Sequence, residues 1–181
     1  MMEPVEITAG AAEAPEKPWA VTGTARTRGN LITSILLEHE KQEIHITGLE
    51  KTYAEIERNE VRWEEIRTED AEILVVAFGI SSRIARAAVD MARDQGVRVG
   101  LLRPISLLPF PARRLRQLAG KVYAIMVLEL NSGQMVDDVR LHVGGITPVE
   151  LMRRTGGMMP AAEEVAEALR KMEKECVGNK A

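Results

Sequence analysis

Four short apolar runs, separated by segments of helical composition, constrain the fold of this chain more than any other feature. The runs contain few polar residues, which is typical of strands that are buried on both faces of a parallel sheet. Glycine, proline or a polar turn lies next to each of them, as is usual for short strands. The runs are residues 73–78, 97–102, 124–130 and 149–152.

The segments between the runs have the spacing of amphipathic helices. Helices are expected at residues 112–118 and 134–143, and a last one after Met159-Pro160. Ser81 or Ser82 is a candidate N-cap for the helix after the first run. The inner face of that helix is expected to consist of Ile84, Ala87, Ala88 and Met91.

Strands alternating with helices predict a parallel sheet with helices on both faces. A partly alternating piece at residues 61–67 adds an edge strand. The sequence therefore predicts an α/β domain with three layers, α/β/α, and a five-stranded, mostly parallel sheet over residues 61–177.

The residues before this domain have a different composition. Residues 1–30 are rich in small, turn-forming and polar residues and predict an arm or linker with little structure of its own. The alternative is an extended segment laid over a domain and anchored by Trp19 and Val21. Residues 31–60 predict a helical connecting segment, interrupted at Gly48.

Charge and composition exclude several classes of function. The net charge is -3 and the isoelectric point about 5.7, so no basic field favours nucleic acid or an anionic membrane as a partner. The single cysteine excludes a disulfide framework, a zinc site of paired cysteines and a cysteine-ligated iron–sulfur cluster. No apolar run reaches the 18 or more residues of a membrane span, and no secretion signal begins the chain. We expect a cytoplasmic protein.

Polar residues gather where the predicted strands end, which is the edge at which open parallel sheets meet ligands and partners. The candidate anion-binding or interface surface consists of Gly79, Ser81, Ser82, Arg103, Glu129, Asn131, Gly133 and Gln134.

Within this surface, Gly79-Ile-Ser-Ser82 precedes a helix, and its backbone N–H groups and hydroxyls are a plausible anion cradle. The simpler interpretation is an ordinary strand–helix turn with a serine cap. The segment lacks both the dinucleotide glycine pattern and the P-loop lysine, so NAD or ATP is not expected here.

The segment Glu129-Leu-Asn-Ser-Gly-Gln134 places a carboxylate and two amides at the end of a buried strand. These groups either hydrogen-bond a neighbouring chain or polar ligand, or cap the next helix and satisfy the turn. Arg103 is expected to pair with Glu129 or, alternatively, with the carboxylate or phosphate of a partner.

The sequence contains no recognisable catalytic set. The three histidines have no companion at metal-ligand spacing, and Cys176 has no neighbouring His or Asp that would activate it. Arg153-Arg154-Thr-Gly-Gly157 either grips a phosphate or forms a solvated rim. No catalytic residue and no metal ligand is predicted, so the chain alone is not expected to be a complete enzyme.

Several motifs, taken together and in this order, resemble a known family. They are Ala71-Glu-Ile-Leu-Val-Val-Ala-Phe-Gly79, Gly100-Leu-Leu-Arg-Pro-Ile-Ser-Leu-Leu-Pro-Phe-Pro111, Glu129-Leu-Asn-Ser-Gly-Gln-Met135 and Arg154-Thr-Gly-Gly157. The chain resembles the C-terminal part of the alpha subunit of 2-oxoacid:ferredoxin oxidoreductases, and most of all the 2-oxoglutarate type, 2-oxoglutarate synthase. The resemblance covers about residues 19–172.

The resemblance implies the fold of a transketolase C-terminal domain, whose five-stranded sheet has an antiparallel first strand. It also implies that the assembled oxidoreductase converts 2-oxoglutarate, coenzyme A and oxidised ferredoxin to succinyl-CoA, CO2 and reduced ferredoxin. The thiamine diphosphate, magnesium and iron–sulfur clusters of that enzyme are expected elsewhere in the complex. The implied partners are a thiamine-diphosphate-binding beta subunit and a cluster-bearing subunit or ferredoxin, with coenzyme A as a further candidate ligand of the strand-end surface.

The chain departs from the family in two places. The thiamine domain that precedes Val21 in the family is not expected in this chain, and Thr24-Ala-Arg-Thr-Arg28 replaces an acidic, histidine-containing stretch. We therefore expect an assembly or scaffold domain that is inactive alone. The alternatives are a stand-alone anion- or coenzyme-A-binding module and the equivalent domain of a 2-oxoacid dehydrogenase.

Overall fold

The computed structural model describes residues 15–31, 33 and 35–178, and the chain divides into two compact units, residues 1–49 and 50–181. Residues 1–14 of the predicted arm lie outside the described part. The rest of the arm contains a short 3-10 helix, η1 (Ala25–Thr27). Asn30 Nδ2 closes this loop by donating to the carbonyls of Pro18 at 2.7 Å and Ala20 at 3.1 Å. The arm thus has more local structure than its composition predicted.

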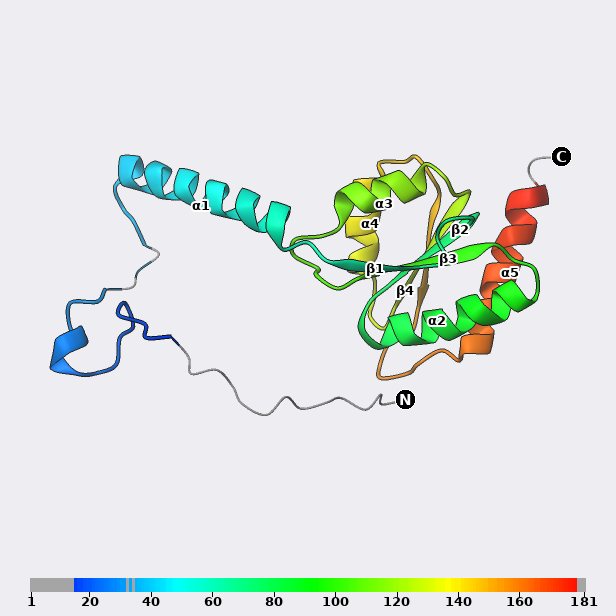
Figure 1. The fold of residues 1–181 in the computed structure, drawn as a ribbon, viewed down its shortest axis with the longest axis horizontal. Helices are drawn as coiled ribbons and strands as arrows, with labels where there is room; N and C mark the ends of the chain where they lie inside the picture. Colours follow the sequence, from blue (N-terminus) through cyan, green and yellow to red (C-terminus); the bar gives the residue numbers. More distant parts are fainter. Residues whose placement is uncertain (1–14, 32, 34, 179–181) are drawn as a thin grey trace. The chain divides into compact units, whose positions relative to one another are not determined.

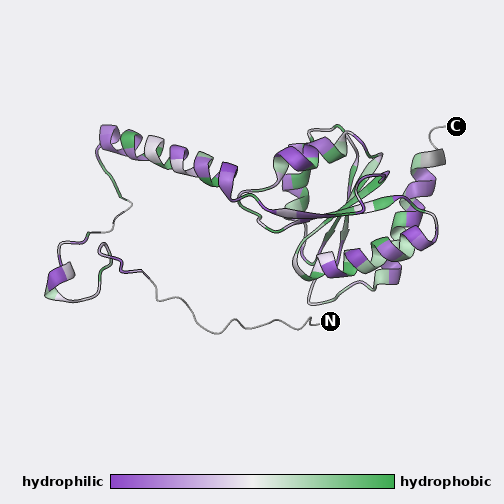
Figure 2. Cartoon of the chain, in the orientation of Figure 1, coloured by the Kyte–Doolittle hydropathy of each residue, from purple (hydrophilic) through white to green (hydrophobic). Residues whose placement is uncertain are grey.

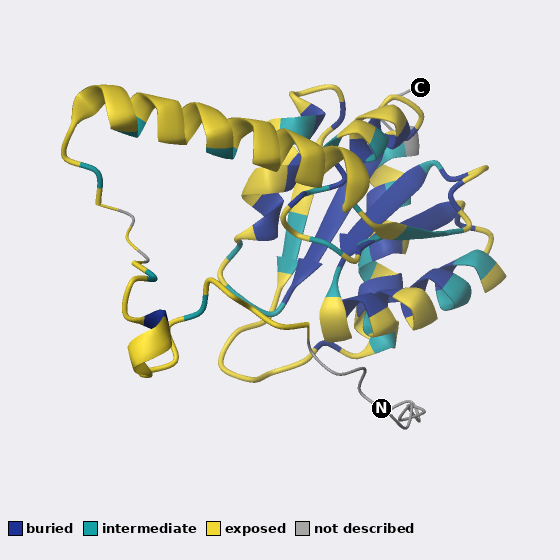
Figure 3. Ribbon diagram, turned by 60° about the vertical axis from the view of Figure 1, so that its left-hand side comes forward, coloured by how far each residue is buried: buried dark blue, intermediate teal, exposed yellow. Residues whose placement is uncertain are grey.

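Helix α1 (His39–Asn59) continues through Gly48, so the predicted interruption is wrong. A glycine inside a helix costs only about 1 kcal/mol relative to alanine, which 20 other helical residues can absorb. None of its residues is buried, and the helix is exposed along its length in Figure 3.

The domain within residues 50–181 is built on a five-stranded sheet of order β1-β3-β2-β4-β5. Strands β2, β3, β4 and β5 are parallel, and β1 pairs antiparallel with β3, bringing Trp63 opposite Pro104. This is the predicted fold class. The strands are β1 (Trp63–Ile66), β2 (Ile73–Ala77), β3 (Val99–Pro104), β4 (Ala124–Glu129) and β5 (Val149–Arg153).

Helices cover both faces of this sheet (Figure 1). On one face lie α2 (Gly79–Asp94) and α5 (Ala162–Gly178). On the other lie α3 (Ala112–Ala119) and α4 (Met135–Val143). Successive residues of a strand point to opposite faces, so Ile73 and Val75 enter one core while Leu74 and Val76 enter the other. Figure 2 shows the consequence, hydrophobic strands beneath helices with mixed faces.

Helix α2 begins earlier than predicted, and its inner face agrees with the prediction except at Ala87. It starts at Gly79, so Ser81 and Ser82 lie inside the helix and neither is its N-cap. Of the predicted inner face, Ala88 is buried, Ile84 and Met91 are partly buried and pack against the core, and Ala87 is exposed. The fully buried positions carry mostly small side chains, which let the helix approach the sheet and α5. The buried residues are Ser81, Ser82, Ala85, Ala88, Val89 and Ala92.

Gly100 in β3 is the glycine that the sheet most plainly requires. A Cβ at this position would lie 2.7 Å from the carbonyl oxygen of Arg67 and 2.9 Å from the Cα of Thr68. Both are backbone atoms, so no side chain can rotate away. The chain between β1 and β2 therefore passes directly over β3 at this point.

We predict that Gly100→Ala lowers the free energy of unfolding by more than about 2 kcal/mol, because the new methyl group forces the backbone apart. Urea denaturation followed by circular dichroism measures the change. Gly48→Ala is the matched control, since a Cβ there would meet no atom within 4 Å and alanine favours a helix. Equal stability of the two variants would contradict the close approach at Gly100.

Candidate functional site

The buried carboxylate of Glu129 caps helix α4. Glu129 is the last residue of β4 and is completely buried. Its Oε2 accepts from the backbone N–H groups of Gln134 at 3.2 Å and Met135 at 2.9 Å, and its Oε1 from that of Val136 at 2.9 Å. A negative charge at a helix N-terminus is favourable, because the first N–H groups lack partners within the helix.

The turn between β4 and α4 is held by Asn131. Its Nδ2 donates to Glu129 Oε2 at 3.0 Å, and its Oδ1 accepts from the N–H of Gly133 at 2.7 Å. Gly133 has a φ of +104°, and a Cβ there would lie 2.9 Å from Cδ2 of Leu151. Of the two interpretations of this segment, the helix cap is confirmed, and its polar groups are largely engaged within the chain.

The Gly79–Ser82 turn does not present its hydroxyls to solvent. Ser81 and Ser82 are buried, and Ser82 Oγ donates to the carbonyl of Gly79 at 2.7 Å. Gly79 itself is exposed and has a φ of +56°. An anion at this turn would thus meet backbone groups and not serine hydroxyls.

The expected pair between Arg103 and Glu129 is wrong. Arg103 instead pairs with Glu64 on the neighbouring edge strand at 2.9 Å, both side chains being partly exposed. Antiparallel pairing of β1 with β3 brings these two residues opposite each other, whereas the Glu129 carboxylate is taken up by the α4 cap. The predicted strand-end surface therefore has only Gly79 and Gln134 fully exposed, with Arg103, Asn131 and Gly133 partly so.

The arginines after β5 are also engaged. Arg153 donates to the carbonyl of Ser132 at 2.8 Å, and Arg154 pairs with Glu164 at 2.8 Å. This ion pair and its hydrogen bond lower the pKa of Glu164. Ser132, Arg153, Arg154, Thr155 and Met158 surround an open pocket of about 430 Å³ at this edge of the sheet. The arrangement agrees with a solvated rim.

The described residues do not gather the side chains of a metal site with several protein ligands. No group of three or more His, Cys, Asp or Glu side chains in that part of the chain could hold a metal ion. Magnesium needs carboxylate or carbonyl oxygens that are free to coordinate. Both carboxylate oxygens of Glu129 already accept hydrogen bonds from backbone N–H groups. His142 stacks on Phe110, with ring centroids 5.4 Å apart, and so serves packing.

We predict that Glu129→Gln lowers the free energy of unfolding by about 2–4 kcal/mol, because an amide NH2 group then faces buried N–H donors. Urea denaturation at neutral pH gives this value. Glu150→Gln is the control, as Glu150 is an exposed residue of the neighbouring strand β5. A change below about 0.5 kcal/mol at Glu129 would contradict the cap.

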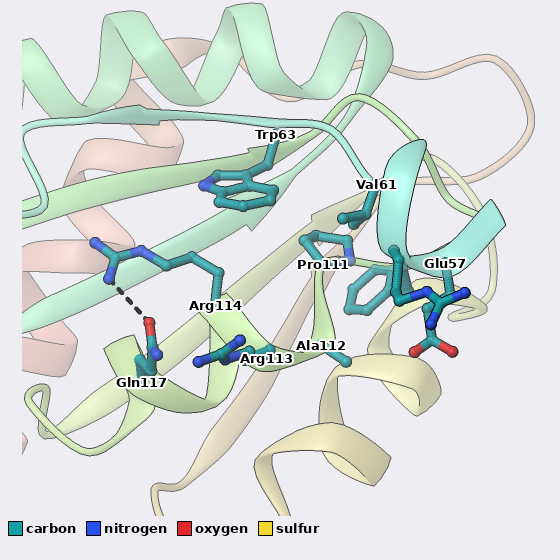
Figure 4. A pocket seen from close by; sticks show the side chains of 10 residues that line it. Glu57, Val61, Trp63, Pro111, Ala112, Arg113, Arg114 and Gln117 are labelled. Carbon is teal, nitrogen blue, oxygen red and sulfur yellow. Dashed lines mark hydrogen bonds between the residues drawn. The ribbon is translucent and has the colours of Figure 1, made fainter. Parts of the chain in front are cut away.

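A second feature, which was not expected from the sequence, is a pocket of about 510 Å³ beside the edge strand (Figure 4). We call it the Trp63–Phe110 pocket. Its apolar wall consists of Val61, Trp63, Phe110, Pro111 and Ala112. Its polar lining consists of Glu57, Arg58, Arg113, Arg114 and Gln117.

Glu65 organises one side of this pocket. Its carboxylate accepts from Trp63 Nε1 at 2.8 Å, from Thr68 Oγ1 at 2.7 Å, and from Arg114 Nε and Nη2 at 2.6 and 2.8 Å. These bonds, above all those from Arg114, lower the pKa of Glu65 from 4.5 to about 2. Arg114 also donates to Gln117 at 3.2 Å, the bond drawn in Figure 4.

The sequence alone does not indicate this pocket. Trp63 lies in the predicted edge strand and Phe110 in a proline-bounded turn, and neither position by itself indicates a cavity. Residues 65 and 114 are 49 positions apart, so their ion pair follows only once α3 is placed next to β1.

We predict that the contribution of Glu65 to stability is lost in acid. Because its folded pKa is lowered, the contribution is full above pH 4.5 and disappears as the pH falls toward about 2. Glu65→Gln should therefore be less stable than the unmodified chain by up to about 3 kcal/mol at pH 7, and nearly equal to it at pH 2.

Chemical denaturation of both proteins across this pH range tests the prediction. Glu64→Gln, on the same strand, removes a more exposed ion pair and should cost less than about 1 kcal/mol at pH 7. A Glu65→Gln deficit that is independent of pH would contradict the role of the ionised carboxylate.

The family described as pyruvate:ferredoxin oxidoreductase core domain II matches residues 71–165, and the chain belongs to it. The chain is 46% identical over 173 residues to the ketoisovalerate oxidoreductase subunit VorB of Methanothermobacter thermautotrophicus, covering 95% of this chain and 49% of that subunit. It is 39% identical over 105 residues to the 2-oxoglutarate synthase subunit KorA of the same organism, covering 58% and 28%.

Two solved structures share the fold. One is 2-oxoglutarate:ferredoxin oxidoreductase from Magnetococcus marinus, with a TM-score of 0.63 at 14% identity over 75% of this chain and 24% of that one. The other is a split-gene transketolase, with a TM-score of 0.53 at 21% identity over 61% of this chain and 40% of that one.

The chain spans about half the length of the ketoisovalerate oxidoreductase subunits that it matches, and less of the 2-oxoglutarate synthase subunits. The relatives are subunits of 2-oxoacid oxidoreductases, which is the class that the sequence motifs indicated. The 2-oxoglutarate type in particular is not singled out. Among the described residues, no helix has the length and apolar character needed to cross a membrane.

Proposed function

We propose that this chain is the C-terminal assembly segment of the alpha subunit of a thiamine-diphosphate-dependent 2-oxoacid:ferredoxin oxidoreductase. The observation that carries the proposal is the match of residues 71–165 to core domain II of that family. In the assembled cytoplasmic enzyme a 2-oxoacid, coenzyme A and oxidised ferredoxin give an acyl-CoA, CO2 and reduced ferredoxin. In that enzyme this chain supports the assembly of the subunits and does not itself carry catalytic residues.

The hydrogen bonding of its buried polar groups supports a structural role for this chain within the enzyme. The buried carboxylate of Glu129 is fixed in a helix cap, and the Ser82 hydroxyl is bonded to its own turn. A catalytic acid, base or nucleophile needs access to substrate, which these groups lack. The proposal assigns thiamine diphosphate, magnesium and the iron–sulfur clusters to a beta subunit and a cluster-bearing subunit or ferredoxin.

The proposed substrate is ketoisovalerate, a branched-chain 2-oxoacid. Two ketoisovalerate oxidoreductase subunits are 46% and 44% identical to this chain over 95% of its length. The proposed substrate is taken from these relatives, because the residues that contact the substrate are expected mainly outside this chain.

The second candidate substrate is 2-oxoglutarate, which the sequence motifs favoured. The 2-oxoglutarate synthase subunit of Methanothermobacter thermautotrophicus is 39% identical over 58% of this chain. Coenzyme A remains a candidate ligand of the exposed turn at Gly79.

Purification of the complex through a tag on this chain, from its source cells, tests the proposal. We expect the complex to contain a thiamine-diphosphate-binding subunit and to reduce ferredoxin only with coenzyme A and a 2-oxoacid. We expect kcat/KM for ketoisovalerate to exceed that for 2-oxoglutarate by at least about tenfold, since a charged and an apolar side chain need different pockets.

The 181-residue chain alone is the control and should show no 2-oxoacid-dependent reduction. Activity of the isolated chain would contradict the assembly role. A complex that prefers 2-oxoglutarate would replace the first substrate with the second while leaving the assembly role intact.

A further inference from the structure

The Trp63–Phe110 pocket is fixed by contacts behind its walls, so it needs no ligand to hold it open. The Trp63 indole is held by its hydrogen bond to Glu65, and that carboxylate is held in turn by Arg114. The Phe110 ring is stacked on His142 of α4 at an interplanar angle of 14°. Its volume, about 510 Å³, is within the range of about 300–1,000 Å³ usual for binding pockets.

The loop between β3 and α3, which contributes Phe110 and Pro111 to the pocket wall, carries further exposed apolar side chains. Ile105, Leu107 and Leu108 are exposed there, Leu108 to 90%. The loop is anchored beside the pocket wall, because the Ile105 N–H donates to the carbonyl of Arg62 at 3.0 Å and the Arg62 N–H donates to Ser106 Oγ at 2.9 Å. Several large apolar side chains exposed on one short loop beside a pocket indicate an interaction site.

The charge around this surface is positive although the chain as a whole carries -3. Helix α3 contains three arginines and no acidic residue. Arg114 is neutralised by Glu65, whereas no carboxylate in the described part of the chain lies within ion-pair distance of Arg58 or Arg113. Glu57 is the acidic residue among the described residues that line the pocket. A ligand with carboxylates next to an apolar group complements this arrangement.

We propose that the Trp63–Phe110 pocket docks an extended segment of a partner subunit, which inserts a large apolar side chain and places flanking carboxylates at Arg58 and Arg113. A polypeptide fits better than a small molecule, because a small ligand in the pocket leaves Leu107 and Leu108 uncovered. The inference rests on the proposed assembly role and names the surface and the partner chemistry through which the chain is held.

Tryptophan fluorescence of the 181-residue chain tests the proposal. The chain has two tryptophans, so Trp19→Phe leaves Trp63 as the reporter. The probe is an acetylated and amidated tetrapeptide of sequence Asp-Leu-Phe-Asp. Saturable quenching or a spectral shift is expected below about 5 mM peptide, and added salt should weaken it.

Two kinds of control separate the charge from the apolar contact. The peptides Lys-Leu-Phe-Lys and Asp-Ser-Ser-Asp should each bind at least about tenfold more weakly, since each lacks one part of the match. The double variant Arg58→Glu, Arg113→Glu should lose at least about tenfold in affinity for the acidic peptide. Arg86→Glu, at an exposed position of α2, should change it by less than about twofold.

No saturable response to Asp-Leu-Phe-Asp, equal binding of the lysine peptide, or equal binding by the double variant would each overturn the proposal. Salt dependence on the unsubstituted surface provides a second test if the double variant does not fold. Failure of this test is distinguishable from failure of the proposed function, because an active complex can form from this chain even if its partner segment binds elsewhere.

Discussion

The buried carboxylate of Glu129 is the constraint on which the strand-end surface of this domain depends. It joins the end of the interior strand β4 to the first turn of α4 through three backbone N–H groups. A buried charge is tolerated only where such bonds compensate its lost hydration. The same bonds remove Glu129 from chemistry, so the polar segment after β4 serves as architecture and the strand ends carry no assembled catalytic set among the described residues.

Glu65 has a comparable role in the edge strand β1. Its bonds to Trp63, Thr68 and Arg114 fasten the antiparallel strand β1 to helix α3. Because the strand is short and half-exposed, these side-chain contacts fix where Trp63 lies. The pocket beside it is thus a product of the fold, which is what a docking surface for another subunit requires.

Much of the fold followed from the sequence, because continuous apolar runs have few other stable arrangements. The antiparallel direction of β1 came from the family resemblance alone. The inner face of α2 was predicted in part: Ile84, Ala88 and Met91 contact the core, but close packing buries Ala85 and Val89 more deeply than Ile84 and Met91. The ion pair of Arg103 with Glu64 could not be predicted from the sequence, and neither could the Trp63–Phe110 pocket. Both depend on side chains that are brought together only by the order of the strands and the placement of the helices.

The central claim is that this chain works by holding a partner and not by performing chemistry. Hydrogen–deuterium exchange of the chain, free and within the purified oxidoreductase, tests it most directly. The account predicts slower exchange in the complex at residues 57–63 and 105–113, with little change in the core strand β2. Unchanged exchange at both of those segments in an intact, active complex would contradict it.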